Sequence, residues 1–475
     1  MREKCGVIGA YSFDDFDVSQ FLVRGLESLQ HRGQESWGIA VFGHDVFKKL
    51  GLVLEDPEDT ISIERMKGNV GIGHVRYSTK GRTAIENAHP IEIGKSFFIS
   101  HNGTIANADE LMNKVSKENS IPSSVTDTEL VGIRLKQIYH QHKDWSTSFE
   151  ILSKELSGSY SMTILTENGE LLAARDERGF RPLCIGYHKE TKTYLMASES
   201  CAFDSLGADL ITDVKPGELI KIDKNGLSTY MFCDEERHAH CPFEYTYFSH
   251  PGSYLEGINV YLARKRIGAE LAKKYRLEGD VVIPVPDSAR PAAQGFSAES
   301  KIPFEEGLMK DRYRKRGSLR SFIEPFQKRR EEIVKKISSV KAIVKDKNVI
   351  VVDDSIVRGT SSLIIADILK KAGVRKISFV ITFPPIRYPC YAGIDFPTQE
   401  ELIAYRFCKD KTDLNHINEM VAFALNVDFV GYNDVEGLCK GIGLSSNEFC
   451  LSCVSGNYSC LKCIPKFRSR EEMKG

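Results

Sequence analysis

The stretch VIVVDDSIVRGTS, Val349–Ser361, decides the fold of the second half of the chain. Four apolar strand-forming residues run into two adjacent acids, Asp353 and Asp354, and then into a loop of Ser, Thr and Gly. A buried strand of a parallel sheet reads as such an apolar run, and ligands bind at the carboxyl ends of such strands. A helix cap and a solvated turn residue would also explain the two acids. The hydroxyl-rich and glycine-rich loop behind them instead favours a phosphate site, with the carboxylates facing sugar hydroxyls or Mg2+.

The segments around this stretch alternate between strand and helix patterns. The helix patterns are NVYLARKRIGAELAKKY (259–275) and SSLIIADILKKAG (361–373), the latter closed by Gly373. The strand patterns are DVVIPVPDSARP (280–291), KNVIVVDDS (347–355) and KISFVITFPP (376–385). This alternation, from Gly257 to about Val435, predicts a parallel, doubly wound sheet.

Residues 1 to about 240 follow a different pattern. Short β-type runs separated by Gly and Asn turns include CGVIGAYS (5–12), VGIGHVRYS (70–78), SFFISHNG (96–103) and SYSMTILTENG (159–169). Helix patterns lie between them at 18–33 and 126–142. This order predicts an α/β domain built from antiparallel hairpins.

Composition sets limits on function. The 475 residues carry a formal net charge of -1, with 41% hydrophobic and 27% charged residues, which is typical of a globular protein. We expect a cytoplasmic protein without a nucleic-acid or membrane partner, because neither a basic excess nor an apolar segment of membrane-spanning length is present.

The stretch VIVVDDSIVRGTS resembles the phosphoribosylpyrophosphate (PRPP) motif of type I phosphoribosyltransferases. That resemblance implies that Asp353 and Asp354 hold the ribose hydroxyls and Mg2+, and that PVPDSARPAA places Asp287 and Ser288 near the pyrophosphate, Ser288 also near the metal. It implies that the 5'-phosphate is wrapped by a loop comprising Ser355, Arg358, Gly359 and Thr360. The basic segment KDRYRKRGSLRSFIEP (310–325) resembles the family's flexible loop, with about four extra residues.

A cysteine near the start of the sequence has two interpretations. Cys5 precedes an apolar run and could be a core thiol at the start of a strand. Alternatively, residues 1–4 are a propeptide, and its removal leaves Cys5 at the N-terminus. Its α-amino group, with a pKa of about 7.7–8.0, could then accept the thiol proton.

Four further motifs favour the second interpretation. HRGQES, GIGHVRYSTKG, FFISHNGTIAN and TDTEL, all within residues 31–130, resemble glutamine amidotransferases of the N-terminal-nucleophile class. The resemblance implies that Arg76 binds the glutamine carboxylate, and that Thr79 and Asp127 hold the amino acid. It implies an oxyanion hole at Asn102 and Gly103. A hairpin turn at Asn102–Gly103 and a helix N-cap at Asp127 are the ordinary structural alternatives.

Together the two halves resemble the glutamine PRPP amidotransferase family. The resemblance implies an α/β protein with an N-terminal αββα N-terminal-nucleophile hydrolase domain and a C-terminal doubly wound type I phosphoribosyltransferase domain. The expected order is a propeptide (1–4), a glutaminase domain (5–240), a phosphoribosyltransferase domain (241–440) and a Cys-rich segment (441–475). It further implies glutamine and PRPP as substrates, purine nucleotides as feedback inhibitors and a homotetramer.

Twelve cysteines are many for a cytoplasmic chain, and five lie in the last 37 residues. Spacing alone, in the run Cys450, Cys453, Cys460 and Cys463, would suit Zn2+. The family resemblance instead implies a [4Fe-4S] cluster held by Cys241, Cys390, Cys450 and Cys453. We favour the cluster, because zinc would leave Cys241 and Cys390 without a role.

Two other functional classes remain as alternatives. A PRPP-sensing regulator could share the fold, but it would have no use for Cys5, Arg76 and Asn102 together. A zinc-dependent nucleic-acid binder acting through CLKCIPKFRSR (460–470) would bind tightly and salt-sensitively, which the near-neutral charge disfavours.

Overall fold

The structure of the chain is a computed structural model. It describes residues 5–77, 84–116, 125–234, 237–310, 337–394, 396, 398–409 and 411–463. The propeptide, Thr79 and most of the basic segment at 310–325 therefore lie outside the described residues. No helix within the described ranges is both long enough and apolar enough to cross a bilayer.

The first half of the chain folds into two stacked antiparallel sheets. One has seven strands in the order β11-β9-β10-β1-β4-β2-β3. Their bounds are β1 Gly6–Ser12, β2 Ser36–Val41, β3 Phe47–Leu50, β4 Val70–Arg76, β9 Cys184–His188, β10 Thr193–Ala197 and β11 Asp209–Asp213. The other has six strands in the order β13-β12-β8-β7-β6-β5. Their bounds are β5 Ile91–Ile93, β6 Phe97–Ile105, β7 Gly158–Thr166, β8 Leu171–Arg175, β12 Glu218–Asp223 and β13 Gly226–Met231.

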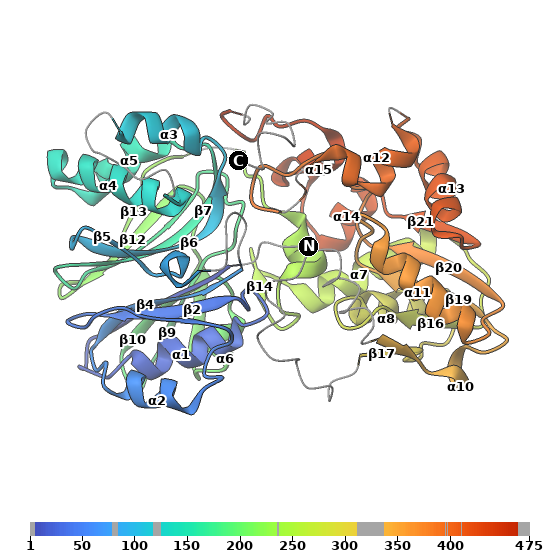
Figure 1. Cartoon of the computed structure of the whole chain (residues 1–475), viewed down its shortest axis with the longest axis horizontal. Helices are drawn as coiled ribbons and strands as arrows, with labels where there is room; N and C mark the ends of the chain where they lie inside the picture. The colour runs from blue at the N-terminus through green and yellow to red at the C-terminus, as the bar shows by residue number, and fades with distance from the viewer. Residues whose placement is uncertain are drawn as a thin grey trace.

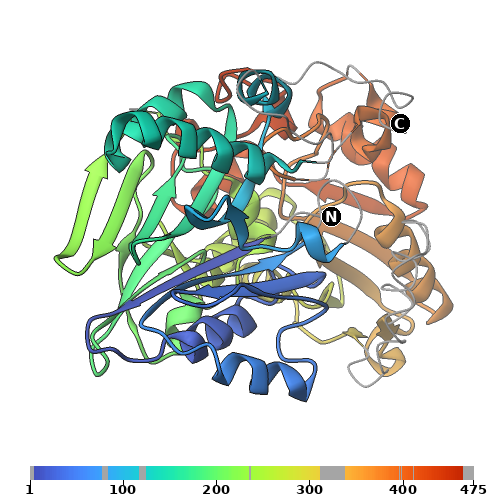
Figure 2. The same ribbon diagram turned by 60° about the vertical axis from the view of Figure 1, so that its left-hand side comes forward.

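Helices cover both outer faces of this pair of sheets, as Figures 1 and 2 show. The seven-stranded sheet is covered by α1 Ser19–Ser28, α2 Pro57–Glu64 and α6 Cys201–Asp204. The six-stranded sheet is covered by α3 Ala108–Val115, α4 Asp127–His142 and α5 Trp145–Glu155. A third apolar cluster, which includes Val7, Ile72 and Ala173, fills the space between the sheets. The expected αββα order is confirmed.

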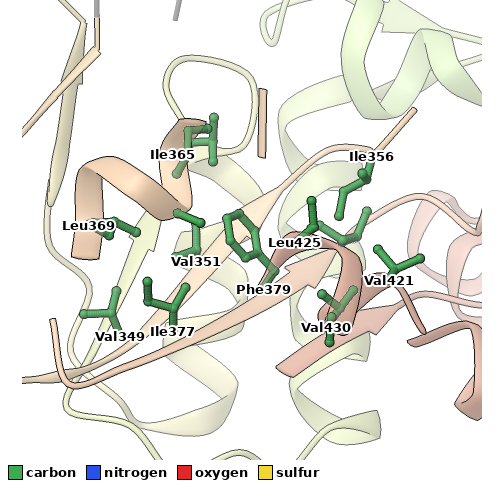
Figure 3. Close-up of a cluster of buried hydrophobic side chains, with 14 of the residues drawn as sticks. Val349, Val351, Ile356, Ile365, Leu369, Ile377, Phe379, Val421, Leu425 and Val430 are labelled. Atoms are coloured by element: carbon green, nitrogen blue, oxygen red, sulfur yellow. The ribbon is translucent and has the colours of Figure 1, made fainter. Parts of the chain in front are cut away.

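The second half contains a four-stranded parallel sheet in the order β16-β19-β20-β21. Its strands are β16 Val281–Pro284, β19 Asn348–Asp353, β20 Lys376–Ile381 and β21 Phe429–Tyr432. Val349 and Val351 pack with α11 Thr360–Lys371 and α13 Leu414–Leu425 on one face (Figure 3). Ile350 and Val352 pack with α7 Val260–Lys274 and α8 Arg290–Ser300 on the other. Apolar burial on both faces is what the run VIVV predicts, so the doubly wound prediction is confirmed.

The remaining elements are short and lie around the parallel sheet. They are the strand pairs β14 Tyr254–Leu255 with β15 Ile258–Asn259 and β17 Leu308–Lys310 with β18 Ile337–Ser339, and the helices α10 Lys341–Val344, α12 Ile403–Cys408, α14 Val435–Ile442 and α15 Ser452–Ser455. Single turns are 3-10 helical at Ile85–Asn87, Gln399–Glu401 and Ser446–Glu448, and π-helical at Glu244–Phe248. An apolar cluster containing Phe243, Phe383 and Leu438 joins this π-helical turn to α7, α14 and the chain after β20.

Candidate functional site

Cys5 directly precedes β1 and lies at the end of the seven-stranded sheet where that strand begins. In the β1–β4 ladder Gly6 is paired with Val75, so Cys5 comes next to Arg76, the last residue of β4. Side chains alternate along a strand, and Val7 points into the space between the two sheets. Cys5 therefore faces the six-stranded sheet, with its Sγ 3.9 Å from the carbonyl oxygen of Tyr77.

Two buried donors near this end of the sandwich have no hydrogen-bond partner among the described residues. They are Nη1 of Arg76 and Nδ2 of Asn102. His74, two residues before Arg76, has its Nε2 3.0 Å from the carbonyl oxygen of His101, which brings β4 and β6 together here. An unsatisfied buried donor costs about 1–3 kcal/mol, so both groups are suited to a ligand that accepts hydrogen bonds. A carboxylate and an amide oxygen are such acceptors.

Gly103 follows Asn102 and adopts a conformation that only glycine tolerates. Its φ is +153°, and a Cβ at this position would lie 2.1 Å from the carbonyl oxygen of Ser159. Asn102–Gly103 lies within β6, opposite Tyr160–Ser161 of β7, and is not a hairpin turn. The alternative interpretation of this pair as a turn is therefore wrong.

Asp127 is the first residue of α4 and not its N-cap. The cap is Thr126, which forms a capping box with Glu129. The Asp127 carboxylate accepts a hydrogen bond from the amide of Ile105, at 3.2 Å, so it is directed toward the end of β6. The alternative role of Asp127 as a cap is thus filled by its neighbour, and its carboxylate bonds Ile105, three residues after Asn102 in β6.

A buried arginine that received no role in the sequence analysis holds Cys5 in place. Arg32, within HRGQES, donates through Nε to the carbonyl oxygen of Cys5 at 2.9 Å. Its two terminal nitrogens donate to both carboxylate oxygens of Glu244, at 3.0 and 2.9 Å, and one also donates to Glu199. Burial lowers the pKa of Arg32, but the two carboxylates outweigh it, so the net pKa is raised and the guanidinium stays charged.

Replacing Arg32 by Met should destabilise the protein strongly. It removes the cation shared by buried Glu199 and Glu244 and leaves them only His31 and Arg181, and breaking a buried ion pair in this way typically costs about 3–5 kcal/mol. We expect a clearly lower midpoint of urea unfolding for Arg32→Met. The same substitution at Arg24, an exposed residue of α1, should leave the midpoint nearly unchanged. Equal midpoints for the two variants would contradict the role of Arg32.

Two buried histidines, His74 and His101, lie close to Arg76 and Asn102 in the sequence, and a third, His89, packs against His74. Burial lowers the pKa of His74 to about 3, and it also lowers the pKa of His89 and His101. The rings of His74 and His89 lie 4.3 Å apart between their centroids. A cluster of neutral imidazoles next to Arg76 avoids positive charges that would repel its guanidinium.

These histidines make stability dependent on pH. The unfolded chain takes up a proton on His74 near pH 6.5, whereas the native protein does so only near pH 3. Stability is therefore full above pH 6.5 and falls as the pH drops, by up to about 1.4 kcal/mol per unit for each such group. Thermal unfolding followed from pH 7 to pH 5 should show a shallower pH dependence for His74→Gln than for the wild type. His142→Gln, at an exposed position, should match the wild type; equal slopes for all three proteins would contradict this account.

In the second half of the chain, Asp353 ends β19 and Asp354 follows it, and both are buried. Burial, together with the neighbouring Asp354 carboxylate, raises the pKa of Asp353 well above its usual value. Two adjacent buried carboxylates need positive charge or hydrogen-bond donors. The pair is thus chemically suited to a divalent cation or to sugar hydroxyls.

The loop that follows β16 reaches the Asp353–Asp354 pair. The Ser288 hydroxyl donates to Asp354 Oδ2 at 2.6 Å, and the Ser355 hydroxyl donates to Asp354 Oδ1 at 2.7 Å. Asp287 is further out, paired with Arg290 and, at 3.3 Å, with Lys310. The two loops that the sequence linked to one ligand therefore meet at Asp354.

The loop after Asp354 leads into α11. Gly359 has a φ of +80° and precedes the helix, and a Cβ there would lie 2.5 Å from Ile403. No side chain of the described residues caps α11, so the amides of its first turn, which begins at Thr360, are available to an anion. Arg358 differs from expectation, because its Nε is engaged by Glu401.

Four cysteines from three parts of the chain line one apolar cavity. They are Cys241, Cys390, Cys450 and Cys453, together with Phe180, Phe243 and Ile394. Burial raises the pKa of Cys241 to about 12, although Arg181 opposes this effect. Cys463 is not among the lining residues: its amide and its carbonyl oxygen bond the hydroxyl of Ser157, each at 3.0 Å. No three cysteines of the described chain are close enough together to hold one metal ion.

One tyrosine lies between the two sites. Burial raises the pKa of Tyr247, in the π-helical turn, and the charge of Asp354 and the hydroxyl of Tyr77 add to this effect. Tyr77 is the residue whose carbonyl oxygen faces Cys5. Tyr247, which is partly buried, therefore lies within electrostatic range of both Tyr77 and the Asp353–Asp354 pair.

Comparison with known proteins agrees with this two-part arrangement. A glutamine amidotransferase domain model matches residues 74–205, and a phosphoribosyl transferase domain model matches residues 253–392. The amidophosphoribosyltransferase of Methanocaldococcus jannaschii is 41% identical over 98% of this chain and 100% of its own length. That of Bacillus subtilis is 38% identical over 96% of this chain and 94% of its own.

Two solved structures are similar over nearly the whole chain. Glutamine PRPP amidotransferase from Bacillus subtilis, complexed with ADP and GMP, has a TM-score of 0.83 at 38% identity and covers 96% of this chain and 97% of its own. A structure described as the allosteric regulatory enzyme of purine biosynthesis has a TM-score of 0.84 at 37% identity, and covers 97% of this chain and 98% of its own.

Proposed function

This chain belongs to the amidophosphoribosyltransferase family, and from that premise we propose which of its residues carry out each half of the reaction. It is a glutamine-dependent glycosyltransferase of purine biosynthesis. Hydrolysis of glutamine supplies ammonia, which displaces pyrophosphate from C1 of PRPP and gives 5-phosphoribosylamine. The observation that carries our assignment is the presence of two prepared sites: buried donors of Arg76 and Asn102 without a partner among the described residues near Cys5, and the buried Asp353–Asp354 pair bonded by Ser288.

In the glutaminase half we propose Cys5 as the nucleophile. Release of the residues before it would free its α-amino group to accept the thiol proton. The thiolate attacks the side-chain amide carbon, and the tetrahedral oxyanion is stabilised by Asn102 Nδ2 and the Gly103 amide. Collapse releases ammonia and leaves a γ-glutamyl thioester, which water converts to glutamate. The unsatisfied donor on Asn102 supports this role.

The same reasoning assigns the substrate's charged ends. Arg76 binds the glutamine α-carboxylate through the guanidinium nitrogen that has no partner among the described residues. Asp127 takes the α-ammonium, and we retain Thr79 as a further contact, although it lies outside the described residues. Arg32 acts as a positioning residue, since it holds the Cys5 backbone.

In the phosphoribosyltransferase half we propose that Asp353, Asp354 and Ser288 would hold Mg2+. The adjacent buried carboxylates and the short contact from Ser288 fit such an ion. When bound, Mg2+ would neutralise charge on the pyrophosphate leaving group. The 5'-phosphate is bound by the loop comprising Ser355, Arg358, Gly359 and Thr360, and Asp287 lies beside the pyrophosphate. Glu401 contacts the Nε of Arg358, and the phosphate would be bound by its terminal nitrogens.

We propose that the four cavity cysteines would hold a [4Fe-4S] cluster. Four thiols around one apolar cavity are the donor set that such clusters use, whereas Cys460 and Cys463 of the C-terminal run do not line this cavity. The cluster would cross-link the segments that carry Cys241 and Cys390 to the C-terminal segment. Zn2+ at the C-terminal run is the less favoured alternative.

Elemental analysis distinguishes a [4Fe-4S] cluster in the cavity from Zn2+ at the C-terminal run. Cys390→Ser should lose most of its iron and sulfide, because one of four ligands is gone. Cys463→Ser, the matched control, should keep the wild-type iron content. Zinc in place of iron, lost with Cys463→Ser and kept with Cys390→Ser, would contradict the cluster. Both variants should be purified anaerobically and measured by elemental analysis.

Four further assignments complete the proposal. We place the domain boundaries at residues 5–240, 241–440 and 441–475. The first lies between the last sandwich strand, which ends at Met231, and α7, which begins at Val260, whereas the second falls within α14. Purine nucleotides are the expected inhibitors, in line with the ADP and GMP named for the Bacillus subtilis structure. A homotetramer and a cytoplasmic location are the expected assembly and compartment.

The direct test of the function is pyrophosphate release from PRPP. We expect release in the presence of Mg2+ to require glutamine or a high concentration of ammonium salt. Pyrophosphate release that is equally fast without glutamine and without ammonium salt would contradict the assignment.

A further inference from the structure

Two thiols lie side by side at the edge of the cysteine-lined cavity. The Sγ atoms of Cys450 and Cys460 are 3.6 Å apart. Cys450 lines the cavity and is partly exposed, whereas Cys460 is buried and does not line it. Cys460 packs in an apolar cluster with Phe180 and Ala392, both of which line the cavity. In this arrangement Cys450 is a lining residue of the cavity and Cys460 lies directly beside it.

A serine holds the two thiols together. The Ser452 hydroxyl oxygen lies 3.5 Å from Cys450 Sγ, which donates to it, and 3.3 Å from Cys460 Sγ. The same hydroxyl donates to the carbonyl oxygen of Asn457 at 2.8 Å. Gly456, with a φ of +73°, ends α15 and turns the chain back toward Cys450.

The segment beyond Cys460 is anchored to the glutaminase domain. Lys462 Nζ donates to the carbonyl oxygen of Ser153 and pairs with Glu177, both at 2.6 Å. The next residue, Cys463, bonds Ser157 through its backbone. These contacts and the Ser452–Asn457 hydrogen bond hold the chain on both sides of Cys460, whose thiol lies beside Cys450.

We propose that Cys450 and Cys460 form an oxidisable pair, which closes to a disulfide when Cys450 carries no iron and a peroxide is present. Peroxide converts the partly exposed Cys450 thiol to a sulfenic acid and releases one water. The Cys460 sulfur then attacks the Cys450 sulfur, forms the S–S bond and releases a second water. The sulfurs must approach by about 1.5 Å, which side-chain rotation can provide.

The pair would control whether the cavity can be filled. A Cys450 sulfur bound to Cys460 cannot bind iron, so an oxidised protein would need a dithiol reductant before it accepts a cluster. This consequence rests on the proposed role of Cys450 as a cluster ligand. Formation of the disulfide itself rests only on the contact between the two thiols. The pair thus protects Cys450 from irreversible oxidation while the site is empty.

The test uses the full-length protein, purified without oxygen, analysed for iron, then stripped by a chelator and treated with one equivalent of hydrogen peroxide. Intact mass should fall by about 2 Da, for the two hydrogens lost. Chymotrypsin cuts after Tyr458, between the two residues, so mass spectrometry of the digest locates the bond. We compare wild type with Cys460→Ser and with Cys463→Ser, its matched control in the same segment.

We expect a Cys450–Cys460 bond in the wild type and in Cys463→Ser, and its absence in Cys460→Ser. After oxidation, the wild type and Cys463→Ser should require a dithiol before they take up iron and sulfide, whereas Cys460→Ser, whose Cys450 sulfenic acid has no partner thiol, should gain oxygen in mass instead of losing hydrogen. No bond at this pair, or a wild-type bond from Cys450 to Cys453 instead, would overturn the inference. If the purified protein holds no iron and the bond still forms, the pair is supported and only the cluster assignment fails.

Discussion

Replacing Cys5 by Ala should abolish glutamine-dependent synthesis of phosphoribosylamine while sparing synthesis from ammonium salt. Loss of a nucleophile that forms a covalent intermediate reduces turnover by at least about 1,000-fold. Added ammonia bypasses that step, because it reaches the phosphoribosyltransferase half directly. Pyrophosphate release should therefore fall to background with glutamine and stay near the wild-type rate with ammonium chloride.

The control for this experiment is Cys463→Ala, a thiol outside both sites. It should behave as the wild type with either nitrogen source. If Cys5→Ala kept its glutamine-dependent rate, Cys5 would be a strand thiol, as its position before β1 also allows. If it lost both rates while remaining folded, Cys5 would serve the second half as well, contrary to the division of labour proposed above.

Replacing Asp354 by Asn should instead strongly slow synthesis from either nitrogen source while sparing glutamine hydrolysis. Asp354 accepts hydrogen bonds from Ser288 and Ser355 and is one of the two charges proposed to hold Mg2+. Loss of that charge should slow synthesis by about 100- to 1,000-fold with glutamine and with ammonium salt alike. Basal hydrolysis of glutamine, measured as glutamate, should persist.

Asp367→Asn is the matched control, since Asp367 lies exposed on α11 and pairs with Lys371 on the same helix. It should leave both activities unchanged. An Asp354→Asn variant as active as this control would remove the Asp353–Asp354 pair from the PRPP site. The two sets of variants together separate the nitrogen-supplying half from the nitrogen-accepting half.

Local patterns in the sequence predict the elements well. The apolar run before Asp353 required burial on both faces, and helices α7, α8, α11 and α13 provide it. Gly373 was expected to close a helix, and it follows the end of α11 with a φ of +86°. In both cases the residues that determine the element are close together in the sequence, so the local sequence pattern is enough to predict it.

Contacts between distant segments could not be predicted in this way. Arg32 reaches Glu244 across 212 positions, and no periodicity in HRGQES points to that carboxylate. Arg358 matches the phosphate loop, yet Glu401 from a later turn engages its guanidinium. The C-terminal cysteines look like one metal site by spacing, but the fold brings Cys241 and Cys390 to two of them. Family resemblance supplied that grouping, because spacing alone favours neighbours.

The central claim is that the two halves act as one enzyme, and glutamate formation from glutamine tests it most directly. The protein should be purified without oxygen and assayed with and without PRPP and Mg2+. We predict a several-fold higher glutaminase rate when both are present, because occupation of the Asp353–Asp354 site reaches Cys5 through the shared surroundings of Tyr247. A rate that does not change with PRPP would show two independent sites and contradict the coupled mechanism.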